Sequence, residues 1–186
     1  MIAHGGQVMA TDQAERLKLV VGDITKLAVD AVVTSANEAL CGGGGVDGAV
    51  HRAAGPGLLD ECLKIGHCPP GQARVTGAYL LPAKCIIHTV GPVWEGGGFG
   101  EAEVLASCYR ESLRLAAERA ARTVAFPSIA TGVYGYPKAE ACEVAVATVS
   151  AWFQAHSLPE QVVFCCFDEE NAELYRRRLR ELGVAV

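Results

Sequence analysis

The sequence predicts an α/β fold, a three-layer α/β/α sandwich around a mixed, mostly parallel central sheet. Short runs of β-branched residues alternate with segments of helical periodicity along the 186 residues, and this alternation is typical of such folds. Several of the runs are apolar throughout, as expected of strands that are covered on both faces. With 51% hydrophobic residues, a chain of this length can build one substantial core.

Six short runs are expected to be strands because of their apolar and β-branched composition. The third and fourth runs are separated only by Pro82-Ala83-Lys84, so we expect them to pair as an antiparallel hairpin. The six expected strands are Leu17–Val21, Ala31–Val33, Val75–Leu81, Cys85–Val90, Thr123–Phe126 and Val162–Phe167.

Helical periodicity appears between these strands. In the first such segment, apolar residues recur at i, i+3, i+4, i+7 and i+8, which places them on one face of a helix; they are Val46, Ala49, Val50, Ala53 and Ala54. Further helices are expected over residues 105–116, 138–156 and 169–182, with Asp168 as the N-cap of the last.

Composition and charge restrict the class of function. The formal net charge of -5 gives no general electrostatic footprint for nucleic acid, although main-chain N–H groups can bind phosphate without Lys or Arg. No segment approaches the ~20 apolar residues that span a bilayer, and the first residues lack a signal-peptide pattern. We therefore expect a cytoplasmic protein without membrane association, whose residues 1–15 form a flexible lead-in.

The eight cysteines form no C-x-x-C pair. Scattered cysteines of this kind are typical of small buried hydrophobic residues in a reducing compartment. His67-Cys68 near Cys62 is the one grouping with some resemblance to a ligand cluster, and we expect neither a metal site nor a disulfide there.

A run of four glycines, residues 42–45, follows an expected buried strand and opens a helix. Each glycine costs on the order of 1 kcal/mol relative to alanine in regular structure, so four in a row favour a close approach of the backbone to a ligand, with free N–H groups facing it. A flexible surface loop is the alternative reading. The run matches neither a Walker loop nor the G-x-G-x-x-G pattern of dinucleotide-binding folds.

Three polar side chains accompany this loop. Asp47 and His51 lie at i and i+4, on one face of the helix just beyond the glycines. Asp47 could simply favour the helix dipole, but beside an anionic ligand it could orient a hydroxyl or a water. Asn37 ends an apolar strand, where its amide could donate to and accept from ribose hydroxyls.

A second loop, residues 126–137, also leaves a strand and precedes a helix. Its Ser, Thr and Gly residues offer hydroxyls and N–H groups suited to phosphate oxygens, and two such loops at one sheet edge favour a ligand with two phosphates. Gly22-Asp23-Ile24-Thr25 closes the first strand, where an Asx turn is the simpler interpretation of Asp23. The glycine-rich segment 96–100 is expected to be a mobile surface loop without chemistry.

These segments, in this order, resemble those of the macrodomain family, and most closely its MacroD-type branch of ADP-ribosyl hydrolases and O-acetyl-ADP-ribose deacetylases. The resemblance rests on GDIT at 22–25, Asn37 followed by GGGGVDGAVHRAAG at 42–55, HTVGP at 88–92 and SIATGVYGYP at 128–137. It covers the chain from about Leu17 to Leu182 and implies that residues 16–186 form a single macrodomain.

The resemblance also implies roles for the candidate residues. Asp23 would hydrogen-bond the adenine amino group, with Ile24 and Phe167 beside the base. Asn37 and Asp47 match the pair that family members use around the distal ribose and the attacking water, and His51 matches a supporting position. The residues that would surround the diphosphate and the distal ribose are Gly43, Gly44, Gly45, Val46, Ser128, Ile129, Ala130, Thr131, Gly132, Val133 and Tyr134.

The implied reaction is hydrolysis of an ADP-ribose ester, on an acidic side chain of a modified protein or in O-acetyl-ADP-ribose. A positioned water near Asp47 would attack while Asn37 fixes the ribose, with no cofactor, no metal and no membrane partner. We expect a monomer, although no sequence feature separates it from a weak dimer.

Two departures and two alternatives remain open at this point. Thr34 stands where the family commonly has Asn, and Ala130 where Ser is frequent, which leaves open a different acceptor such as a modified nucleic-acid base. A non-catalytic ADP-ribose reader module is the first alternative function. A dinucleotide oxidoreductase is the second, and the lack of a G-x-G-x-x-G unit disfavours it.

Overall fold

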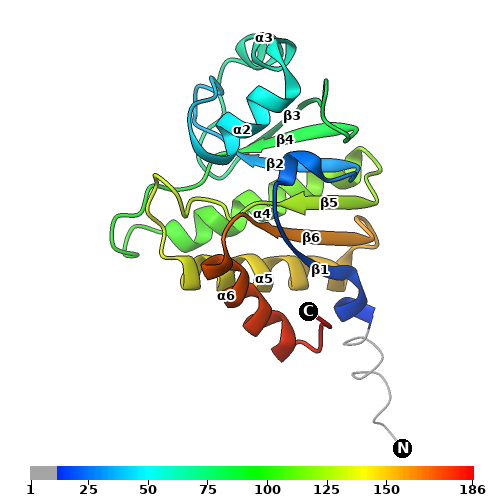
Figure 1. Ribbon diagram of the computed structural model, residues 1–186. Helices are drawn as coiled ribbons and strands as arrows, with labels where there is room; N and C mark the ends of the chain where they lie inside the picture. Colours follow the sequence, from blue (N-terminus) through cyan, green and yellow to red (C-terminus); the bar gives the residue numbers. More distant parts are fainter. Residues whose placement is uncertain (1–11) are drawn as a thin grey trace, which may run out of the picture.

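The computed structural model describes residues 12–186, so most of the expected lead-in, residues 1–15, lies outside the described residues. One six-stranded sheet with the order β1-β6-β5-β2-β4-β3 organises this part of the chain (Figure 1). The strands are β1 (Leu17–Val21), β2 (Ala31–Ser35), β3 (Ala73–Gly77), β4 (Cys85–Thr89), β5 (Thr123–Phe126) and β6 (Gln161–Cys166). The helices are η1 (Ile24–Lys26), α2 (Gly45–Ala54), α3 (Pro56–Ile65), α4 (Glu101–Glu118), α5 (Lys138–Ala155) and α6 (Glu169–Glu181).

The sheet is mixed and mostly parallel, as predicted. Four of its neighbouring pairs are parallel, and only β3 runs antiparallel to β4. The expected hairpin is therefore confirmed as a strand pairing. Asp168 caps α6, because its side chain accepts a hydrogen bond from the N–H of Asn171.

Helices cover both faces of the sheet, which gives the predicted three layers. On one face, α4, α5 and α6 bury a cluster with Tyr109, Phe126 and Tyr175 among its largest side chains. On the other face, α2, α3 and η1 enclose a second cluster that includes Leu58 and Ile86. Successive residues of the buried strands supply the two clusters alternately, because side chains along a strand point to opposite faces.

The prediction of a strand over Val75–Leu81 is wrong at its carboxyl end. β3 ends at Gly77, and Tyr79 follows with φ of 53°, a left-handed conformation that no strand accommodates. The N–H of Leu80 instead donates to the carbonyl of Ala54 at 3.3 Å. Residues 78–81 therefore form a turn against the end of α2, in which Ala78 and Leu81 are buried while Tyr79 and Leu80 are exposed.

Two further features differ from the expectation or add to it. Helix α3 was not predicted; it begins at Pro56 in the first turn and buries Leu58 and Cys62, one helical turn apart. The glycine-rich loop 96–100 is expected to be mobile, but the Glu101 carboxylate accepts from the N–H groups of Glu95, Gly97 and Phe99 at 3.1, 2.7 and 2.6 Å. Three charge-assisted hydrogen bonds tie this loop to the start of α4.

The topology brings five loops to one edge of the sheet. Strands β1, β2, β4, β5 and β6 run parallel, so the segments that follow their carboxyl ends lie along the same edge, where α/β sheets bind ligands. Within the described residues, no helix is long and apolar enough to cross a membrane.

Candidate functional site

A cleft with two adjoining lobes lies at this edge of the sheet. The larger, which we call the proximal lobe, encloses about 690 Å³. The smaller, the distal lobe, encloses about 270 Å³. Gly45, Val46, Ser128 and Gly132 line both lobes, so the two glycine-containing loops meet where the lobes join.

The first loop is folded back on the helix that it opens. A Cβ atom at Gly48 would lie 2.2 Å from the carbonyl oxygen of Gly43, so only glycine permits this approach. Gly45 begins α2 with φ of 60°, and Gly44 caps the helix without a side-chain hydrogen bond. The N-terminal N–H groups of α2 thus face the cleft without a capping side chain, which is the arrangement that binds anions.

The second loop is shaped by a left-handed residue and by close packing. Ala130 has φ of 65°, and its carbonyl accepts from the N–H of Tyr136 at 3.0 Å. A Cβ at Gly91 would lie 2.8 Å from the Cβ of Ala130, so the glycine of the HTVGP segment lets the end of β4 support this loop. In the described part of the chain, no main-chain acceptor takes the N–H groups of residues 131–134, which leaves them for an anionic ligand.

The proximal lobe carries Asp23, Ile24 and Phe167 together. Asp23 Oδ1 accepts from the N–H and the hydroxyl of Thr25 at 2.9 and 2.7 Å, so the Asx-turn interpretation is correct. The hydroxyl and backbone hydrogen bonds from Thr25 lower the pKa of Asp23, which keeps it an ionised acceptor. Phe167 is 80% exposed at the rim, so its ring is open to contact with a ligand.

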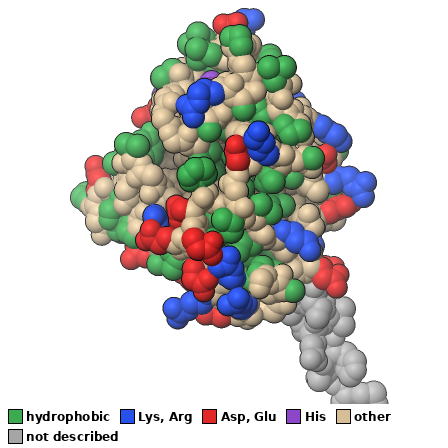
Figure 2. All heavy atoms as spheres, viewed as in Figure 1, with side chains coloured by type: hydrophobic (Ala, Val, Ile, Leu, Met, Phe, Trp, Pro, Cys, Tyr) green, Lys and Arg blue, Asp and Glu red, His purple; other side chains and the backbone are tan. Residues whose placement is uncertain are grey.

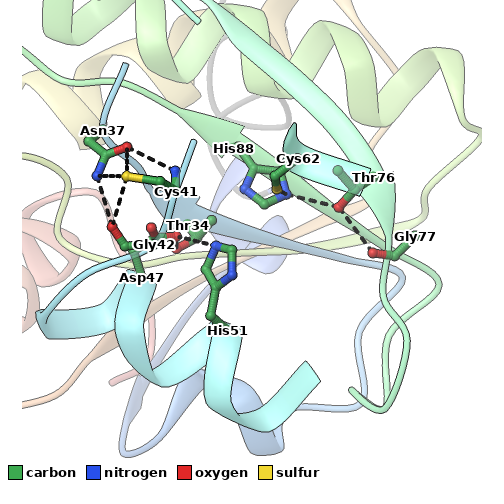
Figure 3. A network of polar contacts seen from close by, with 10 residues as sticks. All are labelled: Thr34, Asn37, Cys41, Gly42, Asp47, His51, Cys62, Thr76, Gly77 and His88. Atoms are coloured by element: carbon green, nitrogen blue, oxygen red, sulfur yellow. Dashed lines mark hydrogen bonds and ion pairs between the residues drawn. The ribbon is translucent and has the colours of Figure 1, made fainter. Parts of the chain in front are cut away.

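The distal lobe is built around Asp47, which is only 5% exposed. Its Oδ1 accepts a hydrogen bond from the Thr34 hydroxyl at 3.0 Å and lies 3.8 Å from His51 Nε2 (Figure 3). Burial raises the pKa of Asp47, while His51 and the Thr34 hydroxyl oppose this rise. Thr34, the residue that departs from the family pattern, is therefore a direct hydrogen-bond partner of the carboxylate.

Asn37 connects the end of β2 to the glycine loop. Its Nδ2 donates to the carbonyl of Gly42 at 2.8 Å, and its Oδ1 accepts from the N–H of Cys41 at 3.2 Å (Figure 3). Both Asn37 and Asp47 line the distal lobe. An amide and a buried carboxylate thus flank one small cavity, and they can hold a sugar hydroxyl and a water between them.

Comparison with known proteins identifies the family of this chain. The sequence model of the family described as "Macro domain" matches residues 33–145. The chain belongs to the macrodomain family. Among curated relatives, it is similar to the O-acetyl-ADP-ribose deacetylase of Escherichia coli strain K12, with 59% identity over 172 residues, 90% of this chain and 97% of that protein.

Solved macrodomains share the fold as well. The Oceanobacillus iheyensis macrodomain with ADP is 41% identical, with a TM-score of 0.83 over 90% of this chain and 91% of that one. The Trypanosoma brucei macrodomain in complex with ADP-ribose is 39% identical, with a TM-score of 0.84 over 88% and 69% of the two chains.

Two of the candidate residues of this macrodomain lie outside both lobes. Ile129 is fully buried in the core beneath the second loop, so its side chain cannot face a ligand. His51 lies behind Asp47 and lines a separate cavity of about 380 Å³. The other candidates line the proximal or the distal lobe; they are Asp23, Ile24, Asn37, Gly43, Gly44, Gly45, Val46, Asp47, Ser128, Ala130, Thr131, Gly132, Val133, Tyr134 and Phe167.

Sequence reasoning gave no site role to four polar residues that line the proximal lobe, Arg52, Lys138, Asp168 and Asn171. Asn171 Oδ1 accepts from the Ser128 hydroxyl at 3.3 Å, so it supports the second loop from α6. Arg52 falls one residue after His51 and Lys138 directly follows the second loop. Their proximity to the two loops is the signal that could have identified them.

Within residues 12–186, the structure also brings together one group of potential metal ligands that the sequence did not predict. It does not involve His67 or Cys68. One ring nitrogen of His51, one of His88 and the Sγ atom of Cys62 all lie within 4.8 Å of one another. The three residues come from α2, β4 and α3, so no spacing in the sequence could reveal them.

Proposed function

We propose that this macrodomain binds ADP-ribose along the two-lobed cleft and hydrolyses ADP-ribosyl esters, with O-acetyl-ADP-ribose as a substrate. The observation that carries this proposal is the pairing of Asn37 with the buried Asp47 in the distal lobe. The names of the curated relatives, and the ADP-ribose bound by the Trypanosoma brucei macrodomain, support it.

In this proposal ADP-ribose has one orientation along the cleft, with the adenine in the proximal lobe and the distal ribose in the distal lobe. The adenine lies in the proximal lobe, where Asp23 accepts from its amino group and Phe167 covers one face. The diphosphate lies between the two loops, where main-chain N–H groups supply the positive partial charge that a protein of net charge -5 does not supply overall. The distal ribose then enters the lobe lined by Asn37 and Asp47.

Hydrolysis proceeds by attack of a water on the ester carbonyl. Asn37 holds the distal ribose through its amide, and the Asp47 carboxylate accepts a hydrogen bond from the water and orients it. The oxygen of the water forms the new bond to the carbonyl carbon, the bond to the ribose oxygen breaks, and that oxygen receives a proton. The products are ADP-ribose and a carboxylic acid, and positioning in the cleft provides most of the acceleration.

The proposal extends to modified macromolecules. The glycine loops leave the distal lobe accessible to an ester on a protein side chain, and ADP-ribosylated nucleic acid is an alternative acceptor. A monomeric, cytoplasmic enzyme is part of the same proposal. A non-catalytic reader is the competing function, since readers share the cradle; the presence of both Asn37 and Asp47 favours an enzyme.

A panel of defined adducts tests the proposal. The purified protein is incubated with O-acetyl-ADP-ribose and with Glu-, Ser-, Arg- and nucleotide-linked ADP-ribose, and the products are identified by mass. We expect release of free ADP-ribose from the ester-linked adducts, and loss of this release in Asn37→Ala. Tight binding of ADP-ribose without release from any adduct would identify a reader instead.

A further inference from the structure

His51, Cys62 and His88 form a buried group behind the distal lobe. Only His51 has a role in the proposed reaction. Cys62 and His88 are fully buried, and the side chain of His51 is 13% exposed. Figure 3 shows the two imidazole rings and the Cys62 side chain close together, with Asp47 beside His51 and Thr76 beside His88.

One ring nitrogen of each histidine in this group lacks the hydrogen-bond partner that a buried polar atom normally has. Within the described residues, His51 Nε2 and His88 Nδ1 are two of four buried side-chain N or O atoms without a hydrogen-bond partner. Native proteins leave few such atoms unpaired, because each costs roughly 1–3 kcal/mol. Two of them in one cluster, next to a thiol, indicate a ligand-binding position.

The surroundings of His88 resemble the support of a metal ligand. The hydroxyl of Thr76 donates to the carbonyl of Gly77 at 3.0 Å, so it is left to accept from His88 Nε2 at 2.8 Å. This bond fixes the ring and leaves Nδ1 with a lone pair, and metal-bound histidines are commonly held through their other nitrogen in this way. Burial lowers the pKa of His88 to about 3, so the ring is neutral and able to ligate.

We propose that His51, Cys62 and His88 form a binding site for a soft divalent cation such as Zn²⁺. Two imidazoles and one thiolate are ligands that zinc prefers, with bonds of about 2.0–2.3 Å. Ligand atoms around such an ion lie about 3.5 Å apart, and the present ligand atoms lie within 4.8 Å of one another. A small shift of the side chains, of which His51 is the partly exposed one, closes this difference, and a water completes the fourth position.

The ion reaches the site from the side of His51. This residue lines the 380 Å³ cavity together with Gly42, Gly43 and Gly48, whereas Cys62 and His88 are covered. On binding, a Zn–S bond forms, the S–H bond of Cys62 breaks, and its proton passes to the solvent; no atom is oxidised or reduced. Burial raises the pKa of the free thiol to about 11, so the thiolate forms only with the metal.

Metal binding regulates turnover, a consequence that rests on the proposed function. His51 Nε2 lies 3.8 Å from the Asp47 carboxylate. An ion that draws His51 toward Cys62 removes its support from Asp47 and places a positive charge nearby, which weakens the carboxylate as an acceptor for the water. Zinc therefore inhibits hydrolysis without occupying the ADP-ribose cleft.

Cobalt titration of the intact protein tests the site itself. We expect one Co²⁺ per chain with a thiolate-to-cobalt charge-transfer band in the near ultraviolet, displaced by Zn²⁺. The affinity falls at least tenfold in Cys62→Ala and in His88→Gln, while Cys85→Ala leaves it unchanged, because Cys85 is buried on β4 outside the group. His51→Gln serves as a third variant, since its partly exposed side chain makes it the least disruptive to folding.

Two results would overturn the proposal. The absence of a charge-transfer band in the wild-type protein, or a band that Cys62→Ala and His51→Gln leave intact, would eliminate the metal site. For the regulatory part, saturating Zn²⁺ lowers wild-type turnover at least tenfold and leaves Cys62→Ala unaffected; equal inhibition of both proteins contradicts it. If the protein hydrolyses no ester at all, the cobalt spectra still decide the site.

Discussion

Gly48 provides the sharpest test of how the first loop is built. In an exposed helix interior, replacement of glycine by alanine stabilises by about 1 kcal/mol. At Gly48 the new Cβ would lie 2.2 Å from the carbonyl oxygen of Gly43. Ordinary van der Waals contact requires about 3.4 Å, so the glycine loop must retreat from α2 by about 1 Å. The steric effect exceeds the gain in helix propensity, and we expect Gly48→Ala to lower the melting temperature.

The same displacement moves N–H groups of the loop away from the ligand. A hydrogen bond to a charged group contributes about 1.5–3 kcal/mol, so the loss of one weakens ADP-ribose binding roughly 10- to 100-fold. Calorimetry measures this affinity. Gly98→Ala is the matched control, because a Cβ there meets nothing within 4 Å and the residue lies outside the cleft. If Gly48→Ala binds ADP-ribose as tightly as Gly98→Ala, the close approach of the loop to α2 does not position the ligand.

Three further predictions concern other parts of the site. Burial raises the pKa of Asp47 and the Thr34 hydroxyl opposes the rise, so Thr34→Val makes ionisation of Asp47 harder and moves the acidic limb of the pH profile of kcat to higher pH. If the limb does not move, the rate does not depend on ionisation of Asp47. Phe167→Ala weakens ADP-ribose binding about 5- to 20-fold through lost contact with the base, whereas the similarly exposed Phe99→Ala does not, as calorimetry on both variants would show. Glu101→Gln weakens three charge-assisted hydrogen bonds to the loop before α4 and lowers the midpoint of chemical denaturation; an unchanged midpoint would mean that the loop is not held by this carboxylate.

The layers of the fold were predictable because their causes are local. The buried parallel strands carry continuous apolar runs, and the helices carry one apolar face, so periodicity alone separates them. The segment 78–81 was misassigned because Ala78 and Leu81 are buried in a turn, and composition does not distinguish a buried turn from a strand. Helix α3 was missed because it follows Gly55-Pro56, and both residues are signals of a break as well as of a helix start.

Part of the candidate site could likewise be predicted from the sequence, and part of it could not. The residues of the two glycine loops could be found from their position after strands, since parallel topology gathers those segments at one edge. The hydrogen bond between Thr34 and Asp47, and the group formed by Cys62 and His88, could not be found, because they depend on contacts between elements distant in the sequence. The interpretation of Thr34 changes most, from a missing family residue to a partner of the buried carboxylate.

The central claim is that Asp47 orients the attacking water in a cleft that binds ADP-ribose by other groups. The most direct test measures, in one preparation of Asp47→Ala, the turnover of O-acetyl-ADP-ribose and the calorimetric affinity for ADP-ribose. Our account predicts that turnover falls at least 100-fold, the order expected for loss of a positioned catalytic group, while the Kd changes by no more than about threefold. Turnover equal to that of the wild-type protein, with binding intact, would contradict it.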